Sequence, residues 1–236
     1  MARSEGGQGA AVLCSGGLDS AVLLAEVARR EAASRVLPIY VSVGLAWEPE
    51  EIAMIDRLLV TPPFRGVLPL ATLRFDMRDV YPPTHWAIRG VPPAYDTPDE
   101  DVYLAGRNLV LLTKAGVVAA KMKADRIALG PLSGNPFPDA RPEFFRAMAQ
   151  ALSLGLDHAL EIATPFLEWE KDAVIQRGVA LGVPFEFTLS CMNPVTGASG
   201  ALPQHCGLCS KCRERRDAFV EARVPDPSTY ANEPPR

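Results

Sequence analysis

The sequence lacks the marks of a membrane or secreted protein. No apolar run approaches the roughly 20 residues that a membrane-spanning helix requires. Residues 1–14 do not combine a charged start with an apolar core, as a signal peptide would. We therefore predict a cytoplasmic protein without a membrane partner.

The sequence also has no excess of positive charge. Its 24 lysines and arginines are outweighed by 28 aspartates and glutamates, which gives a net charge of -4. This balance argues against broad electrostatic capture of DNA or RNA, so a nucleic-acid partner is not expected.

Cysteines are few and unevenly placed. Of the five, Cys14 stands alone and the others lie between positions 191 and 212. A secreted disulfide protein would be shorter and would spread its cysteines more evenly, whereas clustered thiols in a reducing cytosol more often hold a metal. We expect Cys14 to be buried as a small apolar residue.

Strands and helices are predicted to alternate along most of the chain. Apolar runs predict strands at 10–14, 36–43, 68–73, 126–130 and 160–165, and helical spacing predicts helices at 18–30, 48–59, 108–123, 141–155 and 168–181. This alternation indicates an α/β fold, a doubly wound parallel sheet with helices on both faces. The proline-rich stretch 76–100 is expected to be functional or a lid because of its length.

A glycine-rich loop separates the first predicted strand from the first predicted helix. It consists of Ser15, Gly16, Gly17, Leu18, Asp19 and Ser20. Backbone N–H groups of such a loop, together with the helix N-terminus, form an anion site. The Walker motif is excluded because it needs a lysine here, and the dinucleotide fingerprint because it needs a third glycine. The simple alternative is a serine N-cap followed by a tight turn.

The loop resembles the pyrophosphate loop of ATP pyrophosphatases, Ser-Gly-Gly-x-Asp-Ser. These enzymes cut ATP between the α and β phosphates and leave AMP on a carboxylate, carbonyl or amide oxygen. The resemblance implies that the hydroxyls of Ser15 and Ser20 and the N–H groups of Gly16 and Gly17 hold pyrophosphate. Asp19 cannot hold phosphate directly, so we expect its partner to be Mg²⁺ or the loop backbone.

The cysteine cluster supplies four sulfurs, enough for a tetrahedral Zn²⁺ with a structural role. The candidate ligands are Cys191, Cys206, Cys209 and Cys212. His205 could replace a thiolate, although neighbouring residues rarely both bind one metal, and an iron–sulfur cluster would use the same thiolates. We predict a nucleotide-binding domain over 1–188, a zinc-binding segment over 189–230 and a disordered tail over 231–236.

The loop and the cysteine spacing together resemble the 7-cyano-7-deazaguanine synthase family of the queuosine pathway. The stretches "YLAGRNLVLLTKA", "FPDARPEFFRAMAQALSLG" and "IATPFLEWEKDAVIQRGVALGVPFEFTLSCMNP" look like family segments, and the similarity covers nearly the whole chain. It implies a Rossmann-like fold of the adenine nucleotide alpha hydrolase type. It further implies an ATP-dependent ligase that adenylates 7-carboxy-7-deazaguanine and uses ammonia to form an amide and then a nitrile. Family members commonly pair into homodimers.

The resemblance also implies roles for residues outside the two motifs. Arg107 and Asn108 should line the active site, and Lys171 should neutralise phosphate charge as AMP transfers. Asp139 and Arg141 should shape the substrate side.

Each of these residues also has a purely structural interpretation. The arginine and the asparagine could cap the helix that follows them, and Asp139 could be an ordinary N-cap. Lys171 could pair with Glu168 or Glu170 on its own helix. His85 and Trp86, in the proline-rich stretch, could stack on a flat heterocycle or simply pack at the surface.

Two stretches depart from the family pattern on the substrate side. "SVGLAWEPEE" stands where the family has Asp-Tyr-Gly-Gln and basic residues, and "LSGNPFPDAR" lacks two tyrosines and a cysteine of the family's substrate loop. A paralogue that adenylates a different carboxylate is therefore the alternative hypothesis. A tRNA sulfur-insertion enzyme would need a catalytic cysteine outside the cluster, where only Cys14 remains. A non-catalytic nucleotide-binding module would not need the intact loop.

Overall fold

The chain folds around a five-stranded sheet, seen in a computed structural model that describes residues 9–197 and 201–235. The strand order is β3-β2-β1-β4-β5, and every neighbouring pair is parallel. The strands are β1 (Ala10–Leu13), β2 (Val36–Ser42), β3 (Ala71–Arg74), β4 (Arg126–Ala128) and β5 (Glu161–Ala163). The predicted parallel, doubly wound sheet is confirmed.

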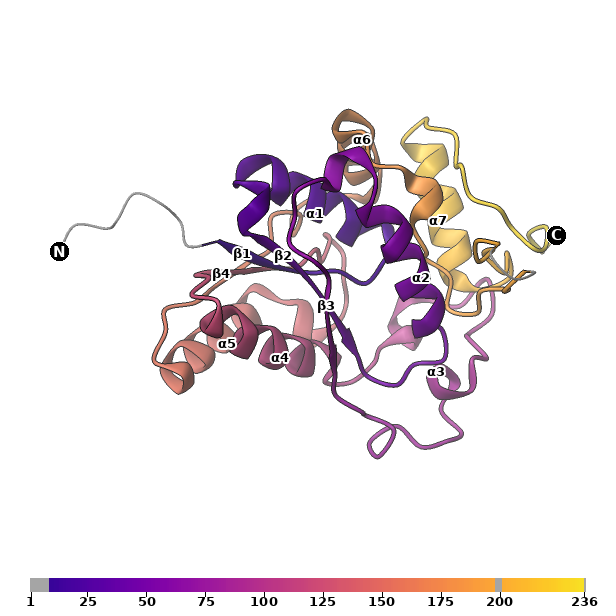
Figure 1. Ribbon diagram of the computed structural model, residues 1–236. Helices are drawn as coiled ribbons and strands as arrows, with labels where there is room; N and C mark the ends of the chain where they lie inside the picture. Colours follow the sequence, from indigo (N-terminus) through magenta and orange to yellow (C-terminus); the bar gives the residue numbers. More distant parts are fainter. Residues whose placement is uncertain (1–8, 198–200, 236) are drawn as a thin grey trace.

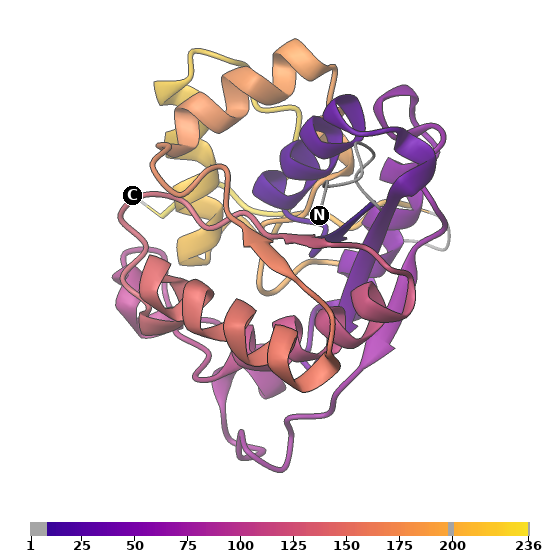
Figure 2. The same ribbon diagram turned by 90° about the vertical axis from the view of Figure 1, so that its left-hand side faces the viewer.

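Helices cover both faces of the sheet (Figures 1 and 2). One face carries α1 (Leu18–Arg30), α2 (Glu48–Leu59), α6 (Lys171–Leu181) and α7 (Ser210–Glu221). The opposite face carries α4 (Arg107–Lys121) and α5 (Pro142–Leu156). The short helix α3 (Trp86–Arg89) lies within the proline-rich connection after β3.

The central strand β1 divides its side chains between two hydrophobic cores. Ala11 and Leu13 pack in the core that contains the buried side of α4, whereas Val12 and Cys14 pack in the core that contains α1. Successive strand residues point to opposite faces of a sheet, so a strand covered on both faces is apolar throughout. The expected burial of Cys14 is confirmed, since it is 2% exposed.

The order in which the chain adds strands to the sheet reverses between β1 and β4. The chain builds β1, β2 and β3 outward on one side, then crosses over through α4 to place β4 on the other side of β1. The segments that leave β1 and β4 therefore diverge to opposite faces of the sheet. In open α/β sheets, ligands bind in the crevice that this divergence leaves at the carboxyl ends of the strands.

Strands β4 and β5 are shorter than predicted, and three other elements differ from the sequence-based expectation for identifiable reasons. β3 begins at Ala71 and not at residue 68, because Pro69 has no N–H to continue the ladder. α6 begins at Lys171, so Glu168 and Glu170 precede the helix. α7 was not predicted at all, because its sequence, SKCRERRDAFVE, is mostly charged and shows little apolar periodicity.

The C-terminal segment packs against the rest of the fold. Phe219 of α7 meets Phe185 edge to face, with ring centroids 5.4 Å apart, in the same core as α1. Within the predicted tail, the N–H of Ala231 donates to the carbonyl of His205, and Asn232 Nδ2 donates to the carbonyl of Cys206. No helix in the part of the chain that the structure describes is long and apolar enough to cross a membrane.

Gly178 allows α6 to pack closely against α1, which generates a stability prediction. A Cβ at this position would lie 2.7 Å from Val22 Cγ2 and closer still to Phe185 Cζ. We expect Gly178→Ala to destabilise the fold by about 1–3 kcal/mol through overpacking, measured as a lower thermal unfolding temperature. Gly155→Ala in α5, where nothing lies within 4 Å, is the control and should be neutral or slightly stabilising. Equal unfolding temperatures for the two variants would contradict this account of the packing.

Candidate active site

The glycine-rich loop lies at the carboxyl end of β1, at the point where the strand order reverses. Gly16 has a φ of 75°, which side chains other than glycine rarely adopt. A Cβ at this position would also lie only 3.0 Å from the carbonyl oxygen of Glu51 on α2. The loop can therefore fit between β1 and α2 only with glycine at this position.

Hydrogen bonds within the loop hold it in a closed turn. Ser20 Oγ donates to the carbonyl of Gly17 at 3.0 Å and accepts from the backbone N–H of Ser15 at 3.2 Å. Gly17, and not a serine, is the N-cap residue of α1, and no side chain among the described residues caps this helix. Leu18 is buried in the core. The serine N-cap interpretation is therefore wrong, and the N-terminus of α1 is left for an anionic ligand.

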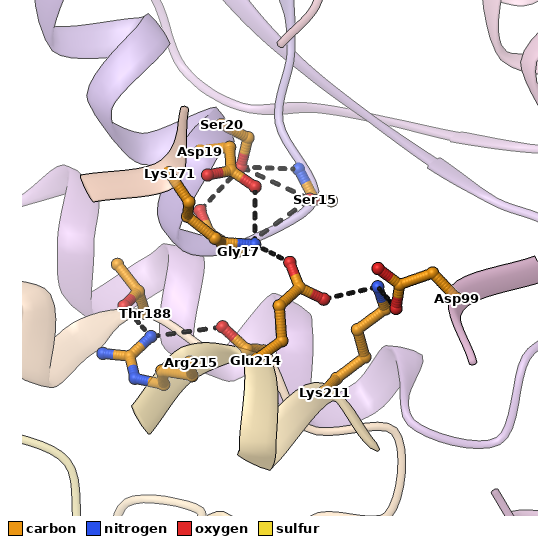
Figure 3. A network of polar contacts seen from close by, with 11 residues as sticks. Ser15, Gly17, Asp19, Ser20, Asp99, Lys171, Thr188, Lys211, Glu214 and Arg215 are labelled. Carbon is orange, nitrogen blue, oxygen red and sulfur yellow. Dashed lines mark hydrogen bonds and ion pairs between the residues drawn. The ribbon is translucent and has the colours of Figure 1, made fainter. Parts of the chain in front are cut away.

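Asp19 and Lys171 meet beside the loop (Figure 3). Lys171 Nζ lies 3.3 Å from Asp19 Oδ2, and its other carboxylate partner is Glu214 on α7. The interpretation of Lys171 as an exposed lysine paired within its own helix is therefore wrong. Sequence reasoning missed Glu214, because the charged pattern of α7 gave no sign of a helix there.

One oxygen of Asp19 has no partner. Asp19 Oδ1 is buried and makes no hydrogen bond within residues 9–197 and 201–235. Leaving such a group unsatisfied costs about 1–3 kcal/mol, so a native site is expected to supply a partner when occupied. Burial raises the pKa of the Asp19 carboxyl, and the Lys171 ammonium offsets only part of that rise. A carboxylate oxygen of this kind suits a divalent cation such as Mg²⁺.

The charges of Lys171 and Glu214 are strongly stabilised by each other. Burial by itself would lower the pKa of Lys171, but Asp19 and Glu214 outweigh it and the pKa is raised. Burial would raise the pKa of Glu214, but Lys171 and Lys211 outweigh it and hold that pKa at about 2. Both groups therefore stay ionised at neutral pH.

Asp139 fixes the start of α4. It lies in the connection after β4, and its Oδ2 accepts the backbone N–H of Asn108 at 3.2 Å, while Asn108 Nδ2 donates to the carbonyl of Asp139 at 2.9 Å. The N-cap residue of α5 is Arg141, so the interpretation of Asp139 as the cap of the following helix is wrong. Burial raises the pKa of Asp139, and the Asn108 N–H partly offsets this.

Arg107 and Arg141 have different positions relative to the loop. Arg107 is the first residue of α4, after the N-cap Gly106, and its Nε is buried without a hydrogen-bond partner among the described residues. Arg141 is exposed and lines neither of the cavities described below. The structure thus brings Arg107 to the loop and leaves Arg141 apart from it.

Two cavities meet at the loop. The smaller, of about 280 Å³, extends along β2 past Tyr40 and ends at Asn108 and Asp139. The larger, of about 560 Å³, contains Lys171 and reaches the stacked rings of Trp47 and Trp86, whose centroids are 5.8 Å apart. Their shared lining includes Ser15, Gly17, Asp19 and Arg107. Both cavities therefore open beside Asp19, where a small molecule could bind.

The four clustered cysteines could hold a metal ion. Their Sγ atoms lie within 4.8 Å of one another, and all four residues are buried. Individual Sγ–Sγ distances are 3.5, 3.8 and 3.9 Å, close to the edge of about 3.8 Å expected for a tetrahedron with bonds of about 2.3 Å. Backbone N–H groups of Asn193 and Cys206 point at Cys191 Sγ, as thiolate ligands require. His205 is not part of the cluster, because its Nε2 accepts the N–H of Ser190.

Comparisons with known proteins agree on one family. Residues 88–223 match the family model of the queuosine biosynthesis protein QueC. The chain is 34% identical over 233 residues to a 7-cyano-7-deazaguanine synthase of Methanothrix thermoacetophila, covering 94% of this chain and 98% of that protein. It is 31% identical over 240 residues to one of Methanopyrus kandleri, covering 93% and 97%.

Among solved structures, the U34-tRNA thiolase NcsA from Methanococcus maripaludis with its 4Fe-4S cluster is similar at a TM-score of 0.45 and 16% sequence identity. The match covers 76% of this chain and 59% of the thiolase. A likeness of this degree says nothing about function.

The cysteine cluster generates a prediction about metal content. We expect the purified protein to carry a stoichiometric metal ion, and Cys209→Ser to lose most of it, because the remaining thiolates cannot close a tetrahedral site. Elemental analysis by mass spectrometry measures this. Cys14→Ala, which removes the cysteine outside the cluster, is the control and should keep its metal. Full metal content in Cys209→Ser would show that the ion binds elsewhere.

Proposed function

The chain belongs to the QueC family of queuosine biosynthesis proteins, and we propose from this that it is an ATP-dependent 7-cyano-7-deazaguanine synthase. The observation that carries the proposal is the buried, unpartnered oxygen of Asp19. It lies beside a lysine and an uncapped helix N-terminus, at the point where two cavities meet. A phosphate chain with its divalent cation supplies the charges that these groups lack.

The proposed reaction uses ATP to convert a carboxylate into a nitrile. The carboxylate of 7-carboxy-7-deazaguanine attacks the α-phosphorus of ATP and pyrophosphate leaves, after which ammonia displaces AMP to give the amide and a proton. The amide oxygen then attacks the α-phosphorus of a second ATP and pyrophosphate leaves again, after which loss of AMP and two protons gives the nitrile. AMP is needed because a carboxylate or amide oxygen is a poor leaving group by itself.

Roles for the chain's own residues follow from their positions. Ser15, Ser20 and the N–H groups of Gly16 and Gly17 would bind pyrophosphate, and Lys171 would neutralise its charge as it leaves. Asp19 would hold Mg²⁺ through its free oxygen.

The residues of α4 would act where the two cavities join. Arg107 would orient the α-phosphate, since it borders both cavities. Asp139 and Asn108 would keep the start of α4 in place through their paired hydrogen bonds.

We assign Zn²⁺ to the cysteine cluster, as a closed four-thiolate site that stabilises the C-terminal segment. The Sγ–Sγ distances support a single tetrahedral ion, and an iron–sulfur cluster with the same ligands is the alternative. Activity in the cytoplasm is part of the proposal, whereas pairing into homodimers rests on the family resemblance alone.

A different carboxylate acceptor is the second candidate function. Trp47 comes from one of the stretches that depart from the family pattern, and it forms part of the larger cavity together with Trp86. A stacked tryptophan pair suits a flat heterocycle but does not by itself select one. Sulfur insertion is less well supported, because burial raises the pKa of Cys14 to about 11 and leaves its thiol a poor nucleophile.

The proposed function predicts pyrophosphate release that depends on the acceptor. With Mg-ATP and ammonium, 7-carboxy-7-deazaguanine should stimulate release, and mass analysis should detect the nitrile. ATP binding without stimulation by this acceptor would favour a different carboxylate. The absence of both ATP binding and pyrophosphate release would overturn the assignment of the site.

Asp19→Asn provides the matching site variant. It keeps the size of the side chain but removes the charge that the divalent cation needs. We expect pyrophosphate release to fall roughly 100-fold or more, about 2.7 kcal/mol of lost transition-state stabilisation, with metal content at the cysteines unchanged. Activity within a few-fold of the unaltered protein would exclude Asp19 from the chemistry.

A further inference from the structure

The polar network at the loop continues onto α7 and as far as Asp99 (Figure 3). Glu214 Oε1 contacts Lys171 Nζ, and Glu214 Oε2 lies 2.5 Å from Lys211 Nζ. Lys211 Nζ in turn lies 3.3 Å from Asp99 Oδ1, in a short 3-10 turn that ends the proline-rich connection. Charges therefore alternate in sign from Asp19 through both lysines to Asp99.

Both ammonium groups border the cavity that contains the loop. Lys171 and Lys211 line it together with Ser15 and Gly17, and their side chains are only 18% and 26% exposed. Partial removal of water strengthens the field of a charge compared with an open surface. An anion in this cavity would therefore meet Lys211 as well as Lys171, besides the Arg107 and Arg213 side chains on the same lining.

The helix that carries Lys211 and Glu214 is firmly held. Arg215, which is fully buried, donates to Thr188 Oγ1 at 2.9 Å and to the carbonyl of Phe185 at 3.0 Å. Lys211 and Glu214 are three residues apart on α7, so they occupy the same side of the helix. The lysine is thus carried by a helix that a buried arginine ties to the core, and Glu214 on the same helix is one of its two partners.

The network has too few negatively charged groups for its two lysines once a divalent cation binds Asp19. Lys171 is the shared partner of Asp19 and Glu214. A divalent cation bound to Asp19 would attract the Asp19 carboxylate and weaken its pairing with the lysine. Glu214 would then be left between two ammonium groups, each with donors to spare. A pyrophosphate group in the same cavity supplies the acceptors that both lysines need.

We propose that Lys211 is a further cation for the phosphate chain, beside Lys171, and that Glu214 is a positioning residue that holds Lys171 and Lys211 toward it. This inference rests on the proposed function and names two further residues of the same site. The C-terminal segment then has a direct part in binding the leaving pyrophosphate, besides carrying the cysteine cluster.

The test measures binding of inorganic pyrophosphate, with Mg²⁺, to the metal-loaded full chain by isothermal titration calorimetry. Lys211→Met keeps the length of the side chain and removes its charge, and we expect the dissociation constant to rise about tenfold. Lys211→Arg should recover most of the affinity. Lys121→Ala, which removes an exposed lysine at the end of α4, is the charge-matched control and should bind like the unaltered protein.

Glu214→Gln separates positioning from simple electrostatics. Removal of a negative charge near the cavity would by itself tighten pyrophosphate binding. If Glu214 positions the lysines, the variant should instead bind several-fold more weakly, with an unchanged content of cysteine-bound metal. Tighter or equal binding would overturn its positioning role.

The two proposals fail in different ways. Unchanged pyrophosphate affinity in Lys211→Met, beside an active unaltered enzyme, would overturn the role of Lys211 and leave the proposed function intact. An unaltered protein that neither binds pyrophosphate nor releases it from ATP would overturn both.

Discussion

The reversal of strand order between β1 and β4 is the constraint on which the rest of the structure depends. Because both faces of β1 are covered, this strand is apolar from end to end, and polar groups can appear only where it stops. The glycine-rich loop begins at that point, and the connection that follows β4 brings Asp139 to the same edge of the sheet. Ser15, Asp19 and Arg107 line both cavities of this crevice, and Asp139 and Lys171 each line one of them.

Charge pairing connects segments that are far apart in the sequence. Lys171 joins the loop of α1 to α7 by binding Asp19 and Glu214, and the carbonyl of Gly16 accepts the N–H of Leu189 at 2.8 Å. Buried charges are costly unless they are paired, and these pairs lie against a cavity. The cysteine-bearing segment is consequently one wall of the candidate site.

Both cavities are lined in part by the stretches that depart from the family pattern. Trp47 lies in the larger cavity, and Phe137 borders both cavities and stacks on Tyr103 with ring centroids 4.9 Å apart. Both cavities therefore have aromatic rings in their linings.

Local patterns by themselves determined much of this protein. Helices α1 and α2 were predicted with their observed bounds, and the four clustered cysteines were identified, because apolar periodicity and cysteine spacing are properties of neighbouring residues. Only the tertiary structure decided the partner of Lys171, the exposure of Arg141 and the existence of α7. These depend on contacts between distant segments: α7 is held by the buried Arg215, and Lys171 is paired across two helices, so no local pattern could predict them.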